Sequence, residues 1–311
     1  MTRHLLTLND WSAEVIEEVI AHGIYVKHHR SEFAHAMAGR TLLMLFEKPS
    51  LRTRVSFETG MEQMGGHAIY YDVSTSPMGK GKESIADVAR TVSRYVDIIM
   101  ARTYEHTTIE ELARYATVPV INGLSNFSHP CQILGDLMTL KEKKGTLVGL
   151  KLAYLGDAHN NVTHSLLFAC PKVGMHMSIG CPAEPKYEPL PDVVASARAA
   201  AQVTGVSVDV HHQPEAAVEG ADVVYTDSWM SYHIPEDERQ ERFAALRPFR
   251  VTSDLMKRAK PDAVFMHCLP AQRGVEQTAE VIDGPQSIVF DQAENRLHIQ
   301  KAIILKLMGR L

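Results

Sequence analysis

The sequence predicts an α/β protein built from two doubly wound, Rossmann-like domains with parallel sheets. Short apolar segments typical of buried strands alternate with segments that have helical periodicity. This alternation runs through the chain twice, with a break near residues 143–149. Strands separated by helices imply parallel sheets covered on both faces. Because ligands bind at the carboxyl ends of such strands, we expect the active site in the cleft between the two domains.

The first run contains four expected strands and five expected helices. A first amphipathic helix has Asp10 or Ser12 as its candidate N-cap. The expected strands are residues 41–46, 68–73, 97–103 and 118–123. The later helices are residues 54–64, 84–96, 108–116 and one that follows His129-Pro130 to residue 145.

The second run begins after Gly145. Its expected strands are residues 150–157, 175–181, 206–212, 222–227 and 263–270. Its expected helices are residues 163–174, 192–205 and 295–309. The alternation therefore supports a second domain of the same class as the first.

Composition narrows the class of protein. The chain has 311 residues, 45% of them hydrophobic and 22% charged, which is typical of globular domains. The net charge is -5 and no block of like charge occurs, which argues against a general nucleic-acid surface. An anionic ligand must therefore be held by a local cluster of cations.

The cysteines and histidines indicate no redox centre or metal site. The four cysteines form no CxxC pair, and the 16 histidines include no HExxH spacing. No apolar run is long enough to span a membrane, and the N-terminus lacks a signal core. We therefore expect a cytoplasmic protein with reduced thiols, without a metal, a membrane or a nucleic acid as partner.

The stretch FEKPSLRTRVSFETG, residues 46–60, predicts an anion site. Pro49 places a turn after the first strand, and Ser50 is a good N-cap for the helix that follows. Leu51, Arg52 and Thr53 then form a first turn with unpaired N–H groups, and Arg52 adds a bidentate cation. A phosphate fits this site best. The alternative is a capped helix with surface arginines; a Walker loop is excluded because GxxxxGK[ST] is missing.

Several motifs together resemble one family. They are S-L-R-T-R (50–54), H-P-C-Q (129–132), D-A-H-N-N-V (157–162), D-S-W-M-S (227–231), H-C-L-P-A (267–271) and E-N-R-L-H-I-Q-K-A (294–302). In this order they resemble the ornithine branch of the aspartate/ornithine carbamoyltransferase family. The resemblance extends over nearly the whole chain, and H-C-L-P disfavours the aspartate branch.

The resemblance implies a reaction and an organisation. Carbamoyl phosphate and L-ornithine would give L-citrulline and phosphate, as in arginine biosynthesis, without a cofactor. Residues 1–145 would bind carbamoyl phosphate and residues 146–291 ornithine. The C-terminal helix, about 292–311, would pack back on the first domain. The family further implies a homotrimer with shared active sites.

The same resemblance assigns roles around the carbamoyl group. Ser50, Arg52 and Thr53 would hold the phosphate, with the backbone of Leu51, where the family commonly has threonine. The remaining assigned residues are Arg102 (bridging phosphate and carbonyl), His129 (polarising the carbonyl), Gln132 (orienting the NH₂), the backbone carbonyl of Leu269, and Arg296. Without the family match, a helix-capping role for His129 and a surface position for Arg296 would be preferred.

The acceptor side has its own assignments. Asp227 and Cys268 resemble the pair that grips the side-chain nitrogen of ornithine. Asn161 would bind the α-carboxylate and α-amine, and Ser231 would contact the α-amine. Asn160 is expected to hold the turn. Because the amine has an ordinary pKa near that of lysine, roughly 10.4, its proton must leave before attack, and the departing phosphate is the expected acceptor of that proton.

Two loops depart from the family pattern. Tyr232 and His233 stand where methionine and glycine are usual, and Tyr232 is expected to line the acceptor site. Putrescine or an N-acylated ornithine is therefore an alternative acceptor. Pro77 stands where a cross-subunit glutamine is usual, and Lys80 or Lys82 is the expected substitute.

Two further classes of protein fit the sequence less well. A nicotinamide-dependent oxidoreductase needs a glycine-rich turn, and LGDAHNN supplies one glycine only. A non-catalytic binding protein would not need Arg52, Arg102, His129 and Arg296 together. The motifs therefore favour carbamoyl transfer.

Overall fold

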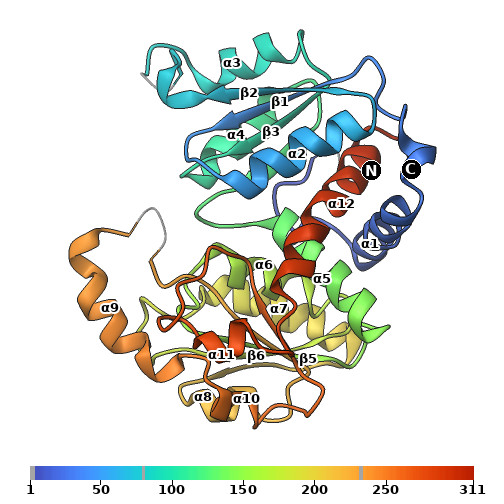
Figure 1. The fold of residues 1–311 in the computed structure, drawn as a ribbon. Coiled ribbons are helices and arrows are strands. Elements are labelled where there is room, and N and C mark those ends of the chain that lie inside the picture. Colours follow the sequence, from blue (N-terminus) through green and yellow to red (C-terminus); the bar gives the residue numbers. More distant parts are fainter. Residues whose placement is uncertain (1–3, 79–80, 231–233) are drawn as a thin grey trace. The chain divides into compact units, whose positions relative to one another are not determined.

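The computed structural model describes residues 4–78, 81–230 and 234–311 (Figure 1). The chain divides into two compact units. The first unit is Met1–Met138 with Glu294–Leu311, and the second is Thr139–Ala293. The divisions fall inside helix α5 (Pro130–Lys144) and inside helix α12 (Val289–Leu307).

The first unit is built on a four-stranded parallel sheet in the order β2-β1-β3-β4. All four predicted strands are confirmed to within a few residues. They are β1 (Thr41–Phe46), β2 (His67–Asp72), β3 (Ile98–Arg102) and β4 (Val120–Leu124). The helices of this unit include α1 (Ala13–His28), α2 (Leu51–Gln63), α3 (Ile85–Val92) and α4 (His106–Tyr115), with short 3₁₀ turns at Arg30–Phe33 and Val73–Thr75.

Burial follows the position of each strand in this sheet. The central strand β3 is buried at every residue, because helices cover both faces of a parallel sheet. Leu43, Leu45, Ile99 and Ala101 from β1 and β3 form one core with the apolar side of α4. The edge strand β2 instead alternates between exposed and half-buried residues. The carboxyl ends of β1 and β3 thus rest on a rigid, buried support.

The second unit is built on a five-stranded parallel sheet in the order β7-β6-β5-β8-β9. Its strands are β5 (Lys151–Leu155), β6 (His176–Gly180), β7 (Val208–His211), β8 (Val223–Thr226) and β9 (Val264–His267). The predicted helices appear as α6 (Asn161–Ala169) and α7 (Pro191–Thr204). The fold class predicted from the sequence is therefore confirmed, and the sheet order reverses direction on either side of β5.

Short helices of the second unit were not predicted. They are α8 (Pro214–Val218), α9 (Arg239–Leu246), α10 (Ser253–Met256) and α11 (Ala279–Ile282), with 3₁₀ turns at Glu236–Glu238 and Arg247–Phe249. Four to eight residues are too few to show helical periodicity, so tertiary packing decides these elements. Helix α12 also begins at Val289, six residues before the expected start at residue 295.

Two chemical expectations can be compared with the structure. All four cysteines are free thiols. Within the described ranges, no helix is long and apolar enough to cross a membrane.

Candidate active site

The start of α2 has the local structure that the sequence predicted. Ser50 is the N-cap, and its Oγ accepts a hydrogen bond from the Thr53 N–H at 3.3 Å. The same hydroxyl donates to Thr53 Oγ1 at 3.1 Å. The side chain of Leu51 is 76% exposed, so this residue offers the site only its backbone. Arg52 lies in the same first turn and is half-buried.

A chain of side-chain hydrogen bonds fixes Arg296 beside this turn. Arg296 Nη1 donates to Gln132 Oε1 at 2.6 Å, and Nη2 donates to Thr53 Oγ1 at 3.5 Å. Gln132 Nε2 donates in turn to Asp136 Oδ1 at 2.8 Å. Arg296 is 2% exposed, so the surface alternative for this residue is wrong. The chain joins α2, α5 and α12 through polar groups, which holds their side chains in one arrangement.

His129 is surrounded by a cluster of cations in the first unit. This cation cluster consists of Arg296, Arg102, Lys48 and Arg52. The residue is buried directly before α5. Burial holds the pKa of His129 well below its ordinary value, and the positive charges of Arg296, Arg102, Lys48 and Arg52 lower it further. The imidazole is therefore neutral at pH 7 and can donate one N–H without adding charge.

Lys48 also belongs to this cluster, although no sequence motif assigned it a role. The side chain is buried, and its ammonium lies 4.7 Å from the ring centroid of Tyr104. Burial first, and then the charge of Arg102, lower the pKa of Lys48 to about 8, against opposing effects of Glu47 and Glu105. The only available signal was its place in the motif-bearing stretch, two residues before Ser50.

The second unit brings Asp227 and Cys268 together. The parallel strands β8 and β9 are neighbours, and Thr226 lies opposite His267. The next residue on each strand therefore emerges at the same edge of the sheet. Cys268 Sγ donates to Asp227 Oδ1 at 2.9 Å. Asp227, His267 and Cys268 each offer one atom that could bind a cation, namely a carboxylate oxygen, a ring nitrogen and the sulfur. These three atoms lie within 4.8 Å of one another, a spacing that suits a small cationic group.

Leu269 has an unusual backbone. Its φ is +57°, and the Leu269–Pro270 peptide bond is cis. A non-glycine residue in the left-handed region costs roughly 1–2 kcal/mol. The Leu269 N–H donates to His267 Nδ1 at 2.9 Å, which helps to hold the turn. Such backbone strain is typical of functional sites, and it lies at the residue whose carbonyl the resemblance assigned to the carbamoyl pocket.

The two asparagines after β5 have different surroundings. Asn160 is the N-cap of α6, and its Oδ1 accepts from the N–H groups of Val162 at 2.8 Å and Thr163 at 2.9 Å. Its Nδ2 donates to the hydroxyl of Tyr154 at 2.8 Å. Asn160 therefore holds the turn, as expected. Asn161 begins α6 and is half-buried.

A buried ion pair beside Trp229 was not predicted. Arg242 on α9 pairs with Asp157 after β5, and both side chains are almost fully buried. Arg242 Nε also donates to the Trp229 carbonyl at 3.1 Å. No local sequence pattern indicates this pairing, because 85 residues separate the two partners.

Some predicted residues lie outside the described residues. They are Ser231, Tyr232, His233 and Lys80. Lys82, the other proposed substitute for the cross-subunit glutamine, is exposed.

Comparison with known proteins identifies the family to which this chain belongs. Residues 3–142 match the model of the aspartate/ornithine carbamoyltransferase carbamoyl-P binding domain. Residues 148–307 match the model of the Asp/Orn binding domain of the same family. The two matches define a carbamoyltransferase, and the chain belongs to the aspartate/ornithine carbamoyltransferase family.

Individual relatives agree over their whole length. The chain is 51% identical to the anabolic ornithine carbamoyltransferase of Pyrococcus furiosus, covering 99% of this chain and 96% of that protein. The solved structure of the ornithine carbamoyltransferase from P. furiosus matches with a TM-score of 0.94 at 50% identity, covering 99% and 97% of the two chains. An N-acetyl-L-ornithine transcarbamylase structure matches with a TM-score of 0.87 at 32% identity, covering 98% and 99%.

Proposed function

We propose that this enzyme transfers the carbamoyl group of carbamoyl phosphate to the side-chain amine of L-ornithine, giving L-citrulline and phosphate for arginine biosynthesis. The observation that carries the proposal is the buried, neutral His129 among the cations Arg296, Arg102, Lys48 and Arg52. Carbamoyl phosphate is a dianion with a polarisable carbonyl. Positive charges would bind its phosphate, and a neutral hydrogen-bond donor would polarise its carbonyl. The 51% identity to an ornithine carbamoyltransferase supports the same substrates.

Carbamoyl phosphate would be bound by the first unit. The N–H groups of the first turn of α2 and the guanidinium of Arg52 would hold the phosphate, with hydroxyls from Ser50 and Thr53. Arg102 would bridge the phosphate and the carbonyl oxygen. The carbamoyl NH₂ would be oriented by Gln132, which Arg296 already fixes at 2.6 Å.

The second unit would bind the acceptor amine. Asp227 would attract the ammonium of the acceptor. Cys268, whose Sγ lies 2.9 Å from Asp227 Oδ1, would contact the same nitrogen. Asn161, Ser231 and Tyr232 are proposed to contact the rest of the acceptor. The carbonyl of Leu269 would accept from the carbamoyl NH₂.

The acceptor nitrogen loses two protons in the reaction. The ammonium first gives one proton to water, and the neutral amine then attacks the carbonyl carbon, which forms a tetrahedral intermediate with a negative oxygen and a positive nitrogen. Arg102, Thr53 and His129 would donate hydrogen bonds to that oxygen, and each such donor typically contributes roughly 100- to 1000-fold in rate. The nitrogen gives its second proton to the phosphate as the bond from carbon to the phosphate oxygen breaks, and the protonated phosphate leaves.

The test is a comparison of acceptors. Purified protein is assayed with carbamoyl phosphate and L-ornithine, N-acetyl-L-ornithine, N-succinyl-L-ornithine, putrescine or L-aspartate, and kcat/KM is measured from the ureido product. We expect kcat/KM for L-ornithine to exceed that for every other amine by more than about 100-fold. An acceptor without one of ornithine's polar groups leaves a buried polar group of the site unpaired, which costs free energy. A higher kcat/KM for any other amine would contradict the proposed acceptor.

We further propose a cytoplasmic homotrimer whose active sites receive a group from the neighbouring subunit, with Lys80 or Lys82 as that group. Self-association is supported by exposed apolar residues on the first unit. Leu51 and Val55 are 76% and 50% exposed one turn apart on α2, and the edge strand β2 exposes Ile69 and Tyr71. Light scattering should give three times the 34.6 kDa of one chain.

We also propose that residues 1–145, with the helix from about 292 to 311, act as the carbamoyl-phosphate domain, and residues 146–291 as the ornithine domain. The division of the chain into two compact units supports this assignment.

A further inference from the structure

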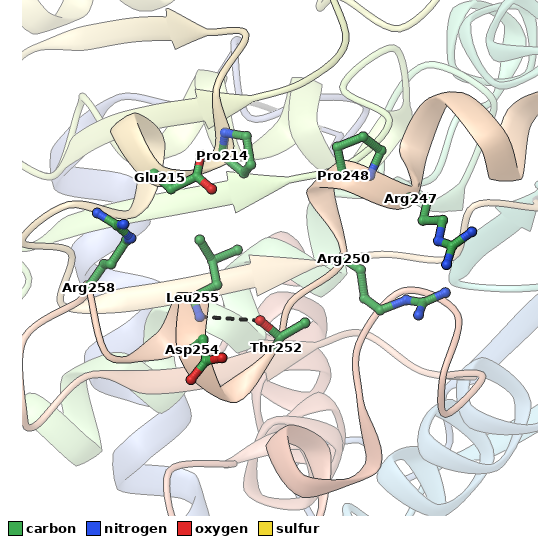
Figure 2. Close-up of a pocket in the computed structure, with 9 residues that line it drawn as sticks. All are labelled: Pro214, Glu215, Arg247, Pro248, Arg250, Thr252, Asp254, Leu255 and Arg258. Carbon is green, nitrogen blue, oxygen red and sulfur yellow. Dashed lines mark hydrogen bonds between the residues drawn. The ribbon is translucent and has the colours of Figure 1, made fainter.

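A cavity of about 360 Å³ lies in the second unit, lined by none of the residues assigned above (Figure 2). Its walls come from the start of α8, the 3₁₀ turn Arg247–Phe249 and the segment around α10. Buried Pro214 and Leu255 contribute apolar surface to its wall. The volume is in the range of small-molecule sites, about 300–1,000 Å³.

Two arginines face the same side of this cavity. Arg247 and Arg250 are joined by a backbone hydrogen bond of 3.3 Å across the 3₁₀ turn. Figure 2 shows both guanidinium groups on one side of the cavity. Two cations on the same side of a cavity favour an anionic ligand there.

The described part of the chain supplies no anion for this pair. Neither Arg247 nor Arg250 forms an ion pair with any described residue. Arg250 Nε donates to the Val275 carbonyl at 2.8 Å, which fixes the side chain and leaves its two terminal nitrogens for a ligand. Of the two acids that line the cavity, Asp254 is paired with Lys257 at 2.7 Å. The other, Glu215, lies on the opposite side in Figure 2, nearer Arg258.

We propose that this cavity binds a small anion carrying two linked phosphate groups, held by Arg247 and Arg250. Each guanidinium can bind one phosphate through a planar pair of N–H donors. The apolar surface of Leu255 and Pro214 would accept an organic part of the ligand. The chain carries a net charge of -5, so a local pair of unneutralised arginines is the feature that selects an anion here.

The test measures pyrophosphate binding by isothermal titration calorimetry. The Arg52→Gln variant serves as background, because it weakens the phosphate site proposed in the first unit. We expect this background to bind pyrophosphate, and the further change Arg247→Gln/Arg250→Gln to weaken that binding by at least about tenfold. Lys141→Gln, at an exposed lysine of α5 that does not line the cavity, should leave the affinity unchanged.

Two results would overturn the proposal. One is the loss of all pyrophosphate binding in Arg52→Gln alone. The other is equal affinity with and without Arg247 and Arg250, with thermal unfolding showing that every variant is folded. Because the readout is binding in a background already impaired at the transfer site, neither result bears on the proposed reaction.

A second inference concerns Glu276, and it rests on the proposed function. Glu276 is 1% exposed, and among the described residues it forms no ion pair. Its Oε2 accepts from the Gln272 N–H at 3.0 Å, and a weaker interaction with the backbone N–H of Trp229 lowers the pKa of the same carboxyl slightly. Trp229 lies two residues after Asp227, and Gln272 four residues after Cys268. One carboxylate therefore joins the two loops that carry the amine-binding pair.

We propose that Glu276 is a positioning residue that sets the relative placement of Asp227 and Cys268 for the acceptor amine. The charged groups around it are few. Asp227 repels it, Arg242 is paired with Asp157, and Arg250 is bonded to the Val275 carbonyl. Burial first, and the charge of Asp227 as well, raise the pKa of Glu276 to about 7. Above that pH the ionised carboxylate holds both N–H groups, and below it the protonated acid holds them less strongly.

The test uses Glu276→Gln, which has the same size but is neutral. We expect the KM for L-ornithine to rise roughly tenfold above pH 7, as for the loss of a charged hydrogen bond. The KM for carbamoyl phosphate should stay unchanged. The ratio of the variant KM to the wild-type KM for ornithine should fall as the pH falls through about 7, because the wild-type carboxylate is then neutral too.

Controls separate positioning from mere stability. Glu280→Gln changes an exposed glutamate four residues away and should have no effect. Glu276→Asp keeps the charge but is shorter, so it should raise the ornithine KM and retain the pH dependence. Equal increases in both KM values, or a ratio independent of pH, would overturn this inference. Turnover of ornithine by the wild type in the same assays reports separately on the proposed function.

Discussion

The proposed anion site of the first unit and the proposed amine site of the second are stabilised in opposite ways. In the first, cations from several elements surround a buried imidazole, and side-chain hydrogen bonds connect Thr53, Arg296, Gln132 and Asp136. In the second, Asp227 and Cys268 follow adjacent strands and are held by backbone turns and the carboxylate of Glu276.

The difference follows from the ligands. Repulsion between buried cations must be offset by a rigid polar frame, so the first site is built before a dianion arrives. Binding an amine needs only the carboxylate of Asp227 and the thiol of Cys268. The second site therefore depends on where the loops after β8 and β9 place these two side chains. Substitutions in the first site should therefore damage carbamoyl-phosphate binding and the chemical step, and substitutions in the second should damage acceptor binding.

The largest expected effect comes from His129→Gln. The variant removes the neutral imidazole that would donate to the carbonyl oxygen, so kcat should fall roughly 100- to 1000-fold. Steady-state assays with both substrates saturating measure this directly. His176→Gln, at a histidine of β6 remote from both sites in sequence and sheet position, is the control and should keep wild-type kcat. A kcat for His129→Gln within a factor of about two of wild type would remove His129 from the step.

Asp227→Asn should have the next largest effect. Loss of the carboxylate would remove the proposed charged hydrogen bond to the amine, worth about 1.5–3 kcal/mol, so kcat/KM for ornithine should fall roughly 10- to 100-fold. The KM for carbamoyl phosphate should not change. Asp209→Asn on β7 gives the matched control at an exposed aspartate. If Asp227→Asn instead weakened carbamoyl phosphate binding, the proposed division of roles would be wrong.

Two N-cap residues, Asn160 in the second unit and Ser50 in the first, allow a further comparison of the two proposed sites. Asn160→Ala removes bonds of 2.8 and 2.9 Å to the start of α6, and should lower the free energy of unfolding by about 1 kcal/mol. Ser50→Ala removes a longer bond of 3.3 Å and should cost less stability, but should raise the KM for carbamoyl phosphate. Thermal or denaturant unfolding and steady-state kinetics on both variants check this. Equal stability losses with unchanged KM values would contradict it.

The smallest expected effect is a pH dependence from Lys48. Its pKa of about 8 means that the ammonium adds to the cation cluster below pH 8 and is lost above it. The KM for carbamoyl phosphate should therefore rise as the pH passes through about 8 in the wild type, and this rise should be absent in Lys48→Met.

The same group affects stability with a defined sign. Because the pKa in the folded chain lies below the ordinary value of 10.5, the folded state releases this proton first. The cost of burying the ammonium is thus present below about pH 8 and relieved as the pH rises towards 10.5. Unfolding of Lys48→Met should lack this contribution, and equal pH profiles for the two proteins would refute it.

The sequence predicted both sheets because each strand is a short apolar run bounded by turn residues. It also predicted the Ser50 cap, where Pro49 fixes the turn and local chemistry decides the structure. The short helices α8 to α11 were missed because packing, and not periodicity, holds them. Local rules are thus sufficient where one segment determines its own conformation.

Groups that act through distant partners could not be predicted. Lys48 is a cluster member only because β3 places Arg102 beside it. Glu276 depends on Trp229, 47 residues earlier in the chain, and Arg242 depends on Asp157. Arg296 was assigned by resemblance, and the contact that fixes it, to Gln132, spans 164 residues.

The most direct test of the division of roles is the binding of phosphonoacetamide, a non-hydrolysable analogue of carbamoyl phosphate, measured by calorimetry without any acceptor. Asp227→Asn and Cys268→Ala should bind it within about twofold of wild type, since neither residue belongs to the anion site. Arg52→Gln and Arg102→Gln should each lose at least roughly tenfold in affinity. If Asp227→Asn weakened the binding as much as Arg52→Gln, the assignment of the anion to the first unit alone would be contradicted.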